Sequence, residues 1–314
     1  MNTRLALVLI LGFFLFGPLS GCRRTEPAAA VSAMSAQPNV LVVNYPLYYF
    51  ATRLAGNSFT VEFPMKENGD PAFWQPDVAT LLAYQKADLI LLNGAGFDAW
   101  TEKVSLPDNK TVDTGAAFKG ELLDSGEAVT HSHGLQGAHT HPKIAFTTWL
   151  DPRLAMLQAD AIAHALIRLR PADAVAINGR LAALKADWAA WARDFEAVVA
   201  GKQQQEVIAS HPVYQYLQRA GGLNWPSVHW EPDEIPTEEQ WRAFSALAKA
   251  HPARWMVWES APLPDVKAKL AKEFGITCVV FDPTSNRPTQ GDLLTAMRAN
   301  LEGLSRVYGT PPAP

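Results

Sequence analysis

AVAINGRLAALKADWAAWARDFEAVVAG, residues 174–201, is the stretch around which the rest of the chain is organised. It lies in a segment from Pro152 to about Gly201 whose Ala-rich and Leu-rich pattern is helical and contains no strand pattern. The preceding RLRPADA ends one helix and begins the next, because proline lacks an N–H and fits the first turn of a helix. At 1.5 Å per residue the second helix would be on the order of 40 Å long. We therefore expect one long rigid helix that joins two lobes and allows little hinge motion.

Short unbroken apolar runs lie on both sides of this helix, and each is followed by polar or turn residues. Such runs are typical of strands buried on both faces, as in parallel sheets covered by helices. Helical stretches separate them, for example residues 76–87 and residues 262–275, the latter ending at a glycine as helices commonly do. The expected fold class is α/β, with two lobes that each contain a mainly parallel sheet flanked by helices. The expected strands are NVLVVN (39–44), FTVEF (59–63), DLILLN (88–93), EVIAS (206–210), RWMVW (254–258) and TCVVF (277–281).

The composition is that of a globular protein with a large core. The chain has 314 residues, of which 48% are hydrophobic and 18% charged, and its length suggests roughly two domains. The formal net charge is −4, the pI is near 6.1, and there is no long basic run. The chain therefore lacks the electrostatic footprint of a nucleic-acid-binding protein.

The first residues, MNTRLALVLILGFFLFGPLSGC, predict a secretory signal, because the apolar run from Leu5 to Phe16 is short for a permanent membrane span. The ending Leu19-Ser20-Gly21-Cys22 resembles a bacterial lipobox, which implies cleavage before Cys22 and lipidation of this cysteine. The alternatives are an ordinary signal peptide or a short uncleaved anchor. Cys278 is then the one thiol left, which excludes a disulfide framework, and within ITCVVF it is expected to be a small buried apolar residue.

The expected organisation has five parts. The residues after Cys22 are rich in Ala, Ser and Pro without an apolar period, as in a flexible tether. In chain order we expect a signal peptide (1–21), a lipidated flexible tether (22–38), an N-terminal α/β lobe (39–151) that includes a histidine-rich loop (125–143), a helical segment with the long connecting helix (152–203), and a C-terminal α/β lobe (204–314).

Two groups of residues indicate a metal site. Four of the eight histidines, His131, His133, His139 and His141, lie close together in SGEAVTHSHGLQGAHTHPKIAFTTWLDP (125–152), and a tract this rich in imidazole commonly binds metal. In addition, His211, Glu259 and Asp282 follow three expected strands of the C-terminal lobe, where ligands of open α/β sheets bind. Imidazole and carboxylate both suit zinc, whereas more carboxylate favours manganese. Helix caps or turns are the alternative role for polar residues at strand ends.

The motifs of the chain follow one another in the order lipobox, tether, DLILLNGAGFDAWTEK, histidine-rich loop, TWLDP, long helix, IASHPVYQYLQRAGGL and VVFDP. In this order the chain resembles the zinc and manganese solute-binding lipoproteins of ABC transporters, specifically the zinc-uptake type with a histidine-rich loop. The resemblance covers nearly all of the chain after the tether. It implies a metal ion held between the lobes, with His211 and Asp282 at two ligand positions of the second lobe. At the two first-lobe positions where the family has histidine, this sequence has Ala72 and Thr147.

Other residues must therefore complete the expected site, since alanine cannot ligate and a threonine hydroxyl is a poor zinc donor. One hypothesis is that one or two of the loop histidines His131, His133, His139 and His141 join His211 and Asp282. A second keeps the loop as a low-affinity collector and takes ligands from His229, Glu231 or Glu259. A third is that this branch has lost metal binding between the lobes.

The resemblance implies the extracytoplasmic solute-binding component of an ABC importer, lipid-anchored in the bacterial cell envelope or periplasm and monomeric. It would capture Zn²⁺, or alternatively Mn²⁺ or another divalent transition metal, and deliver it to a permease driven by its ATPase. No enzyme is expected, because the chain has no HExxH pair, GxSxG turn or Gly-rich phosphate loop. The alternatives are a surface metal-buffering or adhesin lipoprotein without a permease, or a divergent family member that binds a ligand other than zinc.

Overall fold

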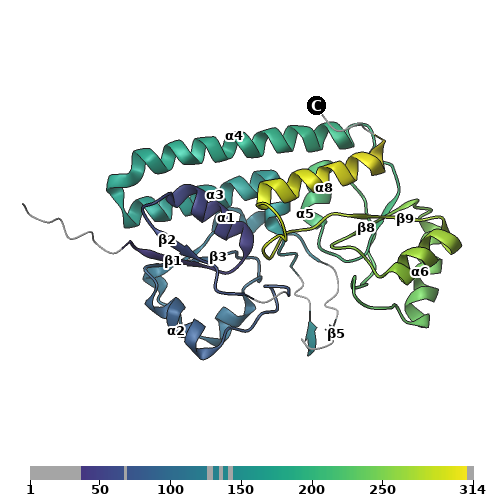
Figure 1. Cartoon of the computed structure of the whole chain (residues 1–314), viewed down its shortest axis with the longest axis horizontal. Coiled ribbons are helices and arrows are strands. Elements are labelled where there is room, and N and C mark those ends of the chain that lie inside the picture. The colour runs from purple at the N-terminus through teal and green to yellow at the C-terminus, as the bar shows by residue number, and fades with distance from the viewer. Residues whose placement is uncertain (1–36, 67–68, 126–129, 134–136, 141–143, 310–314) are drawn as a thin grey trace, which may run out of the picture. The chain divides into compact units, whose positions relative to one another are not determined.

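A computed structural model describes residues 37–66, 69–125, 130–133, 137–140 and 144–309, with the backbone alone at 130–133 and 137–140. From Gln37 onward the chain forms one compact unit (Figure 1). The expected signal peptide, most of the tether and Cys22 lie outside the described residues. Within the described ranges, no helix has the length and apolar character needed to cross a membrane.

The first lobe is built on a four-stranded parallel sheet with the order β2-β1-β3-β4. Its two central strands are the apolar runs NVLV and LILL, which are almost entirely buried. Figure 1 shows α1 and α3 on one side of this sheet and α2 on the other. The strands are β1 (Asn39–Val42), β2 (Thr60–Glu62), β3 (Leu89–Leu92) and β4 (Thr111–Asp113).

The second lobe is built on a three-stranded parallel sheet with the order β7-β8-β9. One face packs on α6 and α7 through a separate apolar cluster that includes Trp230, Trp241 and Trp258. The other face packs on α8, where Gly303 permits a close approach, since a Cβ atom there would lie 3.0 Å from the Val280 carbonyl oxygen. The strands are β7 (Val207–Ala209), β8 (Trp255–Trp258) and β9 (Thr277–Val280).

Polar side chains cap several helices at their N-termini. Asn44 caps α1, Asp151 caps α3, and Thr237 with Gln240 forms a capping box at α6. The α-helices are α1 (Tyr45–Ala55), α2 (Val78–Lys86), α3 (Pro152–Leu169), α4 (Ala174–Val199), α5 (Gln215–Gly221), α6 (Glu238–Ala250), α7 (Pro264–Lys269) and α8 (Leu293–Tyr308). Short 3₁₀ segments lie at Ala99–Lys103, Asp108–Lys110, Ala116–Glu121, Thr148–Leu150 and Pro171–Asp173, and a π turn at Leu270–Phe274 extends α7.

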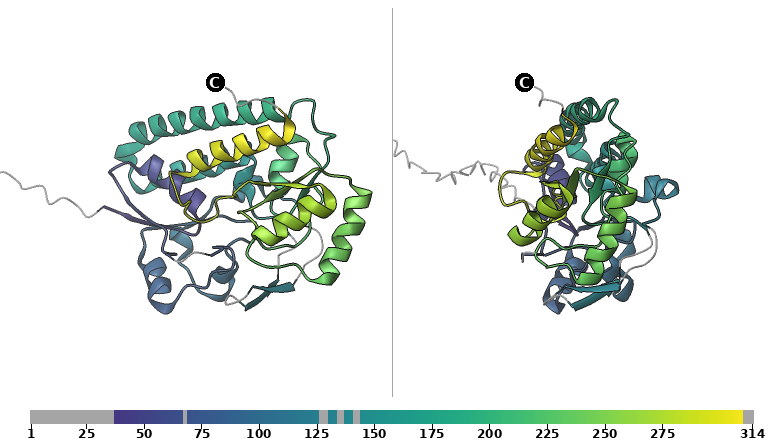
Figure 2. Two further views of the ribbon diagram at one scale, coloured as in Figure 1. Left: turned by 45° about the vertical axis from the view of Figure 1, so that its right-hand side comes forward. Right: turned by 90° about the vertical axis from the view of Figure 1, so that its right-hand side faces the viewer.

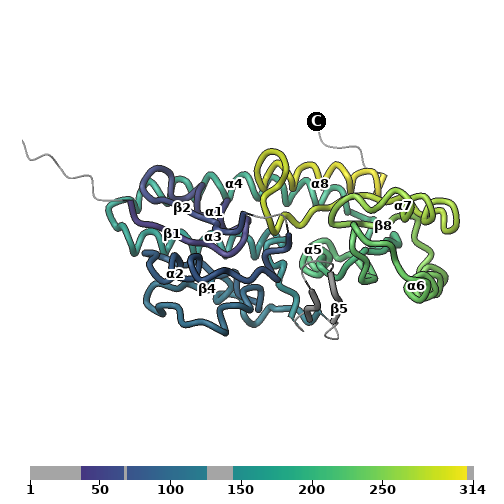
Figure 3. The backbone as a smooth tube through the Cα atoms, turned by 60° about the horizontal axis from the view of Figure 1, so that its bottom comes forward, coloured from purple at the N-terminus to yellow at the C-terminus, as the bar shows by residue number. Residues whose placement is uncertain are grey.

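The predicted long helix is α4, which packs on α1 and α3 of the first lobe and on α5 and α8 of the second. Figures 2 and 3 show α8 lying alongside α4. Trp191 on α4 donates a hydrogen bond of 2.9 Å to the Met297 carbonyl on α8. The buried side chains of α4 belong to one continuous core that reaches from Val40 in β1 to Phe281 after β9. The fold class is thus the predicted one, whereas the boundaries drawn at residues 151 and 203 stay predictions.

A short antiparallel hairpin interrupts the expected histidine-rich loop. It is formed by β5 (Thr130–His133) and β6 (Gly137–Thr140), with His131 opposite His139. In the same register His133 pairs with Gly137. His141 lies outside the described residues.

Candidate metal-binding site

The carboxyl edge of the second sheet brings His211 and Glu259 together. Glu259 directly follows β8, and His211 lies two residues beyond β7. The hydrogen bond from the Ser210 amide to the Val257 carbonyl, 2.8 Å, continues the β7–β8 pairing one residue further. His211 is buried, with 5% of its surface exposed. Its Nδ1 lies 2.9 Å from Glu259 Oε1. Two of the predicted site residues are therefore in direct contact.

His229 and Glu231 join this pair from a segment that runs beside β7. The Val228 amide donates to the Ala209 carbonyl at 3.0 Å, and the Trp230 amide donates to the Ser210 carbonyl at 2.8 Å. Trp230 is buried in the apolar cluster of the second lobe, so alternation along this extended segment turns its two neighbours toward the sheet edge. Glu231 Oε1 lies 3.4 Å from His211 Nε2, and the rings of His211 and His229 are 5.7 Å apart.

Burial and neighbouring charges shift the pKa values of the two histidines in opposite directions. Burial lowers the pKa of His211, but the Glu259 hydrogen bond and the charges of Glu259, Glu231 and Asp70 outweigh it and raise this pKa above 6.5. Burial and the neighbouring His211 lower the pKa of His229. Burial raises the pKa of Glu231 to about 7, with Glu259 and Asp70 adding to the effect and His211 opposing it. The cluster thus holds more carboxylate than imidazole and retains protons near neutral pH.

Asp70 is the first-lobe member of this cluster, and the sequence analysis did not select it. Its Oδ1 accepts a hydrogen bond of 2.9 Å from the Ala72 amide. Burial raises the pKa of Asp70 to about 6, and among the charges that act on it are Glu259, which raises it, and His211, which lowers it. Asp70 therefore lies within electrostatic reach of the second-lobe residues. Its position in NGDPAFWQP, two residues before Ala72, was the available signal.

Asp282, the other second-lobe candidate, lies two residues beyond β9. Its Oδ1 accepts a hydrogen bond of 2.6 Å from the Thr284 amide. Burial raises its pKa, the Thr284 contact opposes this, and the Glu259 carboxylate adds to it. Asp282 is thus coupled to the cluster through Glu259.

The two positions where the resembling family has histidine have structural roles here. Thr147 is buried, with 3% of its surface exposed, and its Oγ1 donates a hydrogen bond of 2.5 Å to the Val213 carbonyl in the second lobe. Ala72 is buried in the first-lobe core. The first-lobe ligands expected from the resemblance are therefore absent from both positions.

In the described part of the chain, no three His, Cys, Asp or Glu side chains are arranged as the ligands of one metal ion would be. Both ring nitrogens of His211 face carboxylates instead. The arrangement is that of an ion-pair cluster, with an imidazole at its centre. A divalent cation that bound His211 in this cluster would have to replace at least one of these contacts, because a histidine binds metal through a free nitrogen of its neutral imidazole.

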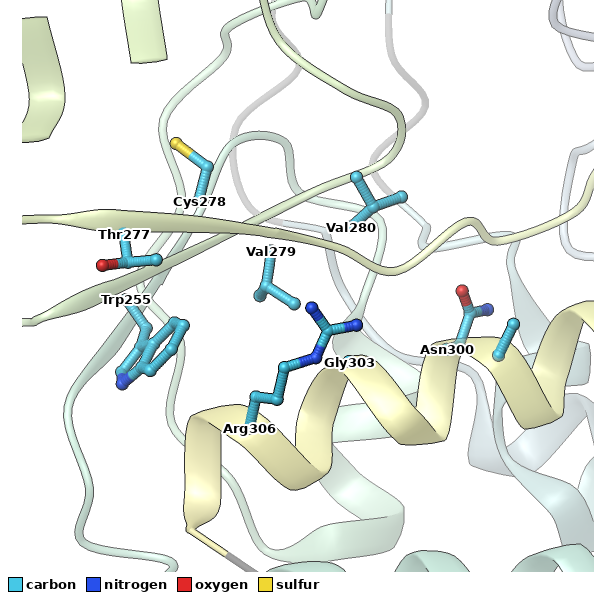
Figure 4. A pocket seen from close by; sticks show the side chains of 9 residues that line it. Trp255, Thr277, Cys278, Val279, Val280, Asn300, Gly303 and Arg306 are labelled. Carbon is cyan, nitrogen blue, oxygen red and sulfur yellow. The ribbon is translucent and has the colours of Figure 1, made fainter. Parts of the chain in front are cut away.

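A hollow lies between β9 and α8 (Figure 4). It has a volume of about 430 Å³ and is lined by Trp255, Asn300 and Arg306 among others. Burial raises the pKa of the nearby Cys278 thiol to about 11, so this group stays protonated and is a poor metal ligand at neutral pH. In Figure 4 Val279 faces α8 and Cys278 points to the opposite side of β9. The candidate metal site is therefore the His211 cluster, where potential ligands converge.

The family model described as "Zinc-uptake complex component A periplasmic" matches residues 40–307. The chain belongs to this family. Members of this zinc-uptake family are solute-binding proteins, which are not enzymes, and this confirms the prediction that the chain is not an enzyme. The resemblance described from the sequence motifs is confirmed as well.

Among the curated relatives of this family member, the zinc-binding lipoprotein AdcA of Streptococcus pneumoniae is 22% identical over 280 residues. The matched region covers 85% of this chain and 55% of AdcA, so the chain spans about half the length of that relative.

Solved structures show the two-lobed fold of the family. Zn(II)-bound AdcA from Streptococcus pneumoniae has a TM-score of 0.75 and 19% identity, covering 88% of this chain and 59% of AdcA. The metal-dependent lipoprotein YcdH from Bacillus subtilis has a TM-score of 0.74 and 17% identity, covering 86% and 99%. The solute-binding protein FpvC of P. aeruginosa, in complex with Ni²⁺, has a TM-score of 0.70 and 20% identity, covering 87% and 97%.

Proposed function

We propose that this chain is the extracytoplasmic solute-binding component of an importer, which captures a divalent transition metal between its lobes and delivers it to a membrane permease. One observation carries the proposal. In a member of the zinc-uptake family, a buried His211 stands between Glu259 and Glu231 at the carboxyl edge of a parallel sheet, and Asp70 of the other lobe lies within electrostatic reach. Ligands of open α/β sheets bind at this edge.

Zinc is the first candidate for the cargo, because relatives of this chain are a zinc-binding lipoprotein and a Zn(II)-bound structure. The available donors are the two imidazoles of His211 and His229 and the carboxylates of Glu231, Glu259 and Asp282. Zinc accepts both types of donor, and an oxygen-rich set also suits manganese. A nickel-bound structure with the same fold makes Ni²⁺ a third ion to test.

Capture would require His211 to lose a proton and one carboxylate contact. The ring is held between Glu259 and Glu231, which favour its charged form. A dication placed in the same cluster would neutralise these carboxylates in place of the imidazolium. Metal binding would therefore release protons, as it does wherever histidine is a ligand.

The histidine-rich loop would be a further source of imidazole. The β5–β6 hairpin pairs His131 with His139 in its register, His133 is in β5, and His141 follows β6 in the sequence. These residues would either complete the main site or collect ions for it. A deletion of residues 131–141 separates the two roles, because loss of tight binding indicates direct ligation and survival of tight binding indicates collection.

The cellular setting is part of the proposal. The lipobox-like end at Cys22 and the tether would anchor the mature chain to the membrane as a monomer, beside an ABC permease and its ATPase. AdcA, the curated relative, is itself named a lipoprotein. Metabolic labelling of the expressed chain with a radioactive fatty acid, compared with Cys22→Ser, would test the anchor.

The main test is a chelator-competition titration of the mature chain with Zn²⁺, Mn²⁺ and Ni²⁺. His211→Ala is expected to weaken binding of the preferred ion by about 100-fold, since it removes the central imidazole. His164→Ala is the matched control, because this exposed histidine on α3 is remote from the cluster in sequence and element. Equal affinities of the wild type and His211→Ala would refute the proposed site.

A further inference from the structure

The loop after β9 crosses from the second lobe to the first. It begins at Asp282, and its Ser285 carbonyl accepts a hydrogen bond of 2.9 Å from the Tyr45 amide at the start of α1. Thr284 has a positive φ of 59°, which is unusual for a residue other than glycine, and is buried at 1% exposure. The path of this loop is therefore set by packing on both sides.

Asn286 and Arg287 at the far end of this loop both donate to one first-lobe segment. Asn286 Nδ2 donates to the Gly69 carbonyl at 2.9 Å. Arg287 Nη2 donates to the Phe63 carbonyl at 2.6 Å, and Nη1 donates to the Met65 carbonyl. The guanidinium also lies over the Phe63 ring, 4.5 Å from its centroid. Two consecutive side chains of one lobe thus hold three carbonyl groups of the other.

The contacts hold Phe63, Met65 and Gly69 of this first-lobe segment. Phe63 and Met65 are each 3% exposed, so their side chains are anchored in the first-lobe core while their carbonyls are bound from outside. Gly69 is bound by Asn286, and the next residue is Asp70, whose Oδ1 is fixed by the Ala72 amide. The second carboxylate oxygen of Asp70 is not used in that contact.

We propose that the loop Asp282–Arg287 is an interlobe strap whose Asn286 and Arg287 position Asp70, and that Asp70 is the first-lobe ligand of the captured ion. This proposal rests on the proposed function. The family has a histidine at the position of Ala72. In this chain Asp70, two residues before Ala72, would supply a first-lobe ligand instead. Carboxylate oxygen is an accepted ligand of zinc and of manganese.

The strap also links two acidic residues of the site. Asp282 opens the loop, and Asp70 follows the segment that the loop holds, so a displacement of either lobe moves both carboxylates. Arginine suits this role because its planar fork donates to two carbonyls at once, which a lysine ammonium cannot do with the same geometry. Breaking the Arg287 contacts would let Asp70 leave the cluster and would speed release of the ion.

Asp70→Asn tests the ligand. The asparagine side chain keeps an oxygen that can accept from the Ala72 amide, so the turn is retained while the negative charge is lost. Zinc affinity by chelator competition is expected to fall by about tenfold or more. In the Asp70→Asn background, Ala72→His places an imidazole at the family's position and is expected to recover most of the lost affinity.

Arg287→Ala tests the strap. Zinc affinity is expected to fall by about tenfold, with faster release in stopped-flow, and Arg287→Lys is expected to recover only part of the loss. The matched control is Arg180→Ala, because Arg180 also donates to two backbone carbonyls, those of Leu54 and Ala55, at the first-lobe end of α4. The control is expected to lower stability without changing zinc affinity. Asp70→Asn and Arg287→Ala are expected to be non-additive in affinity, since both act through one carboxylate.

The outcomes separate this inference from the proposed function. If His211→Ala abolishes tight binding while Asp70→Asn leaves it unchanged, the site stands and the strap proposal is overturned. If Arg287→Ala and Arg180→Ala weaken zinc equally, Arg287 is a general structural residue and the positioning role is overturned. If no variant, His211→Ala included, alters binding, the proposed function itself fails.

Discussion

At the scale of single residues, the structure explains why two expected ligands could be replaced. Thr147 uses its hydroxyl to tie the first lobe to the Val213 carbonyl, and Ala72 packs in the first-lobe core. Neither side chain is suited to bind a metal ion. The acidic first-lobe residue within electrostatic reach of the cluster is Asp70, and Asn286 and Arg287 of the other lobe donate hydrogen bonds to carbonyls of the segment before it.

Thr147→Val is expected to destabilise the chain without affecting metal binding. The substitution leaves the Val213 carbonyl without the buried donor that it has now, and such a loss costs about 1–3 kcal/mol. Urea denaturation of the apo protein should show the decrease in the free energy of unfolding. Chelator competition should show an unchanged affinity for zinc, and a loss of affinity would mean that the hydroxyl is a ligand after all.

Asp98→Asn is expected to remove a loss of stability that the wild-type chain undergoes as the pH rises from about 4 to about 8. Asp98 is buried at 6% exposure, and burial raises its pKa to about 8 from an ordinary value of 3.8. The folded state keeps the carboxyl protonated while the unfolded chain ionises it, so stability is lost as the pH rises from about 4 to about 8. The slope from this group is about 1.4 kcal/mol per pH unit. Urea denaturation at pH 5, 6 and 7 should show that Asp98→Asn removes this slope in the free energy of unfolding. The same slope in both proteins would contradict a raised pKa of Asp98 in the folded chain.

At the scale of elements, the sequence predicted six strands from short apolar runs, and VIA of β7 and WMVW of β8 are buried as expected. TVE of β2 is instead exposed at both ends. The sequence did not predict β4, because TVD is three residues long and has polar residues at both ends. It also did not predict the β5–β6 hairpin, whose histidines and glycine show no apolar alternation. The location of Asp70 could not be predicted, since the Asn286 contact that holds its neighbour joins residues 217 positions apart.

The capping box of α6 is an element feature whose residues fit the Thr-x-x-Gln pattern of such boxes. The Gln240 amide donates to Thr237 Oγ1 at 3.2 Å, and Gln240 Oε1 accepts from the Thr237 amide at 2.7 Å. Thr237→Ala is expected to lower the free energy of unfolding by about 1 kcal/mol, because it leaves an N-terminal amide of the helix without its acceptor. Thr237→Ser should retain most of the stability, and equal losses for both variants would assign the effect to the lost methyl group.

At the scale of the whole molecule, α4 and α8 make the two sheets parts of one body. Both helices contact both lobes' cores, and the buried cluster extends through them without a break. Large rotations of one lobe against the other would break this packing. We therefore expect cargo exchange to depend on smaller movements near the strap and the His211 cluster.

Metal affinity of the intact chain is expected to fall as the pH drops. Protons and metal compete for the same atoms, and the carboxylates raise the pKa of His211 above 6.5 while that of Glu231 is about 7. The apparent affinity should decrease by up to about tenfold per pH unit for each ligand that becomes protonated. Titrations at pH 8, 7, 6 and 5 would show the slope, and a constant affinity over this range would exclude histidine ligation.

The continuity of the core through α4 has a practical consequence for identifying the cargo. A ligand that binds only the folded chain stabilises it by RT ln(1 + [L]/Kd), and this stabilisation is shared by everything that unfolds with it. Because no break in the buried cluster separates the two sheets, the described body should melt as one unit. The rise in melting temperature that each ion causes in the intact chain should therefore follow its affinity. An isolated lobe would not give this comparison.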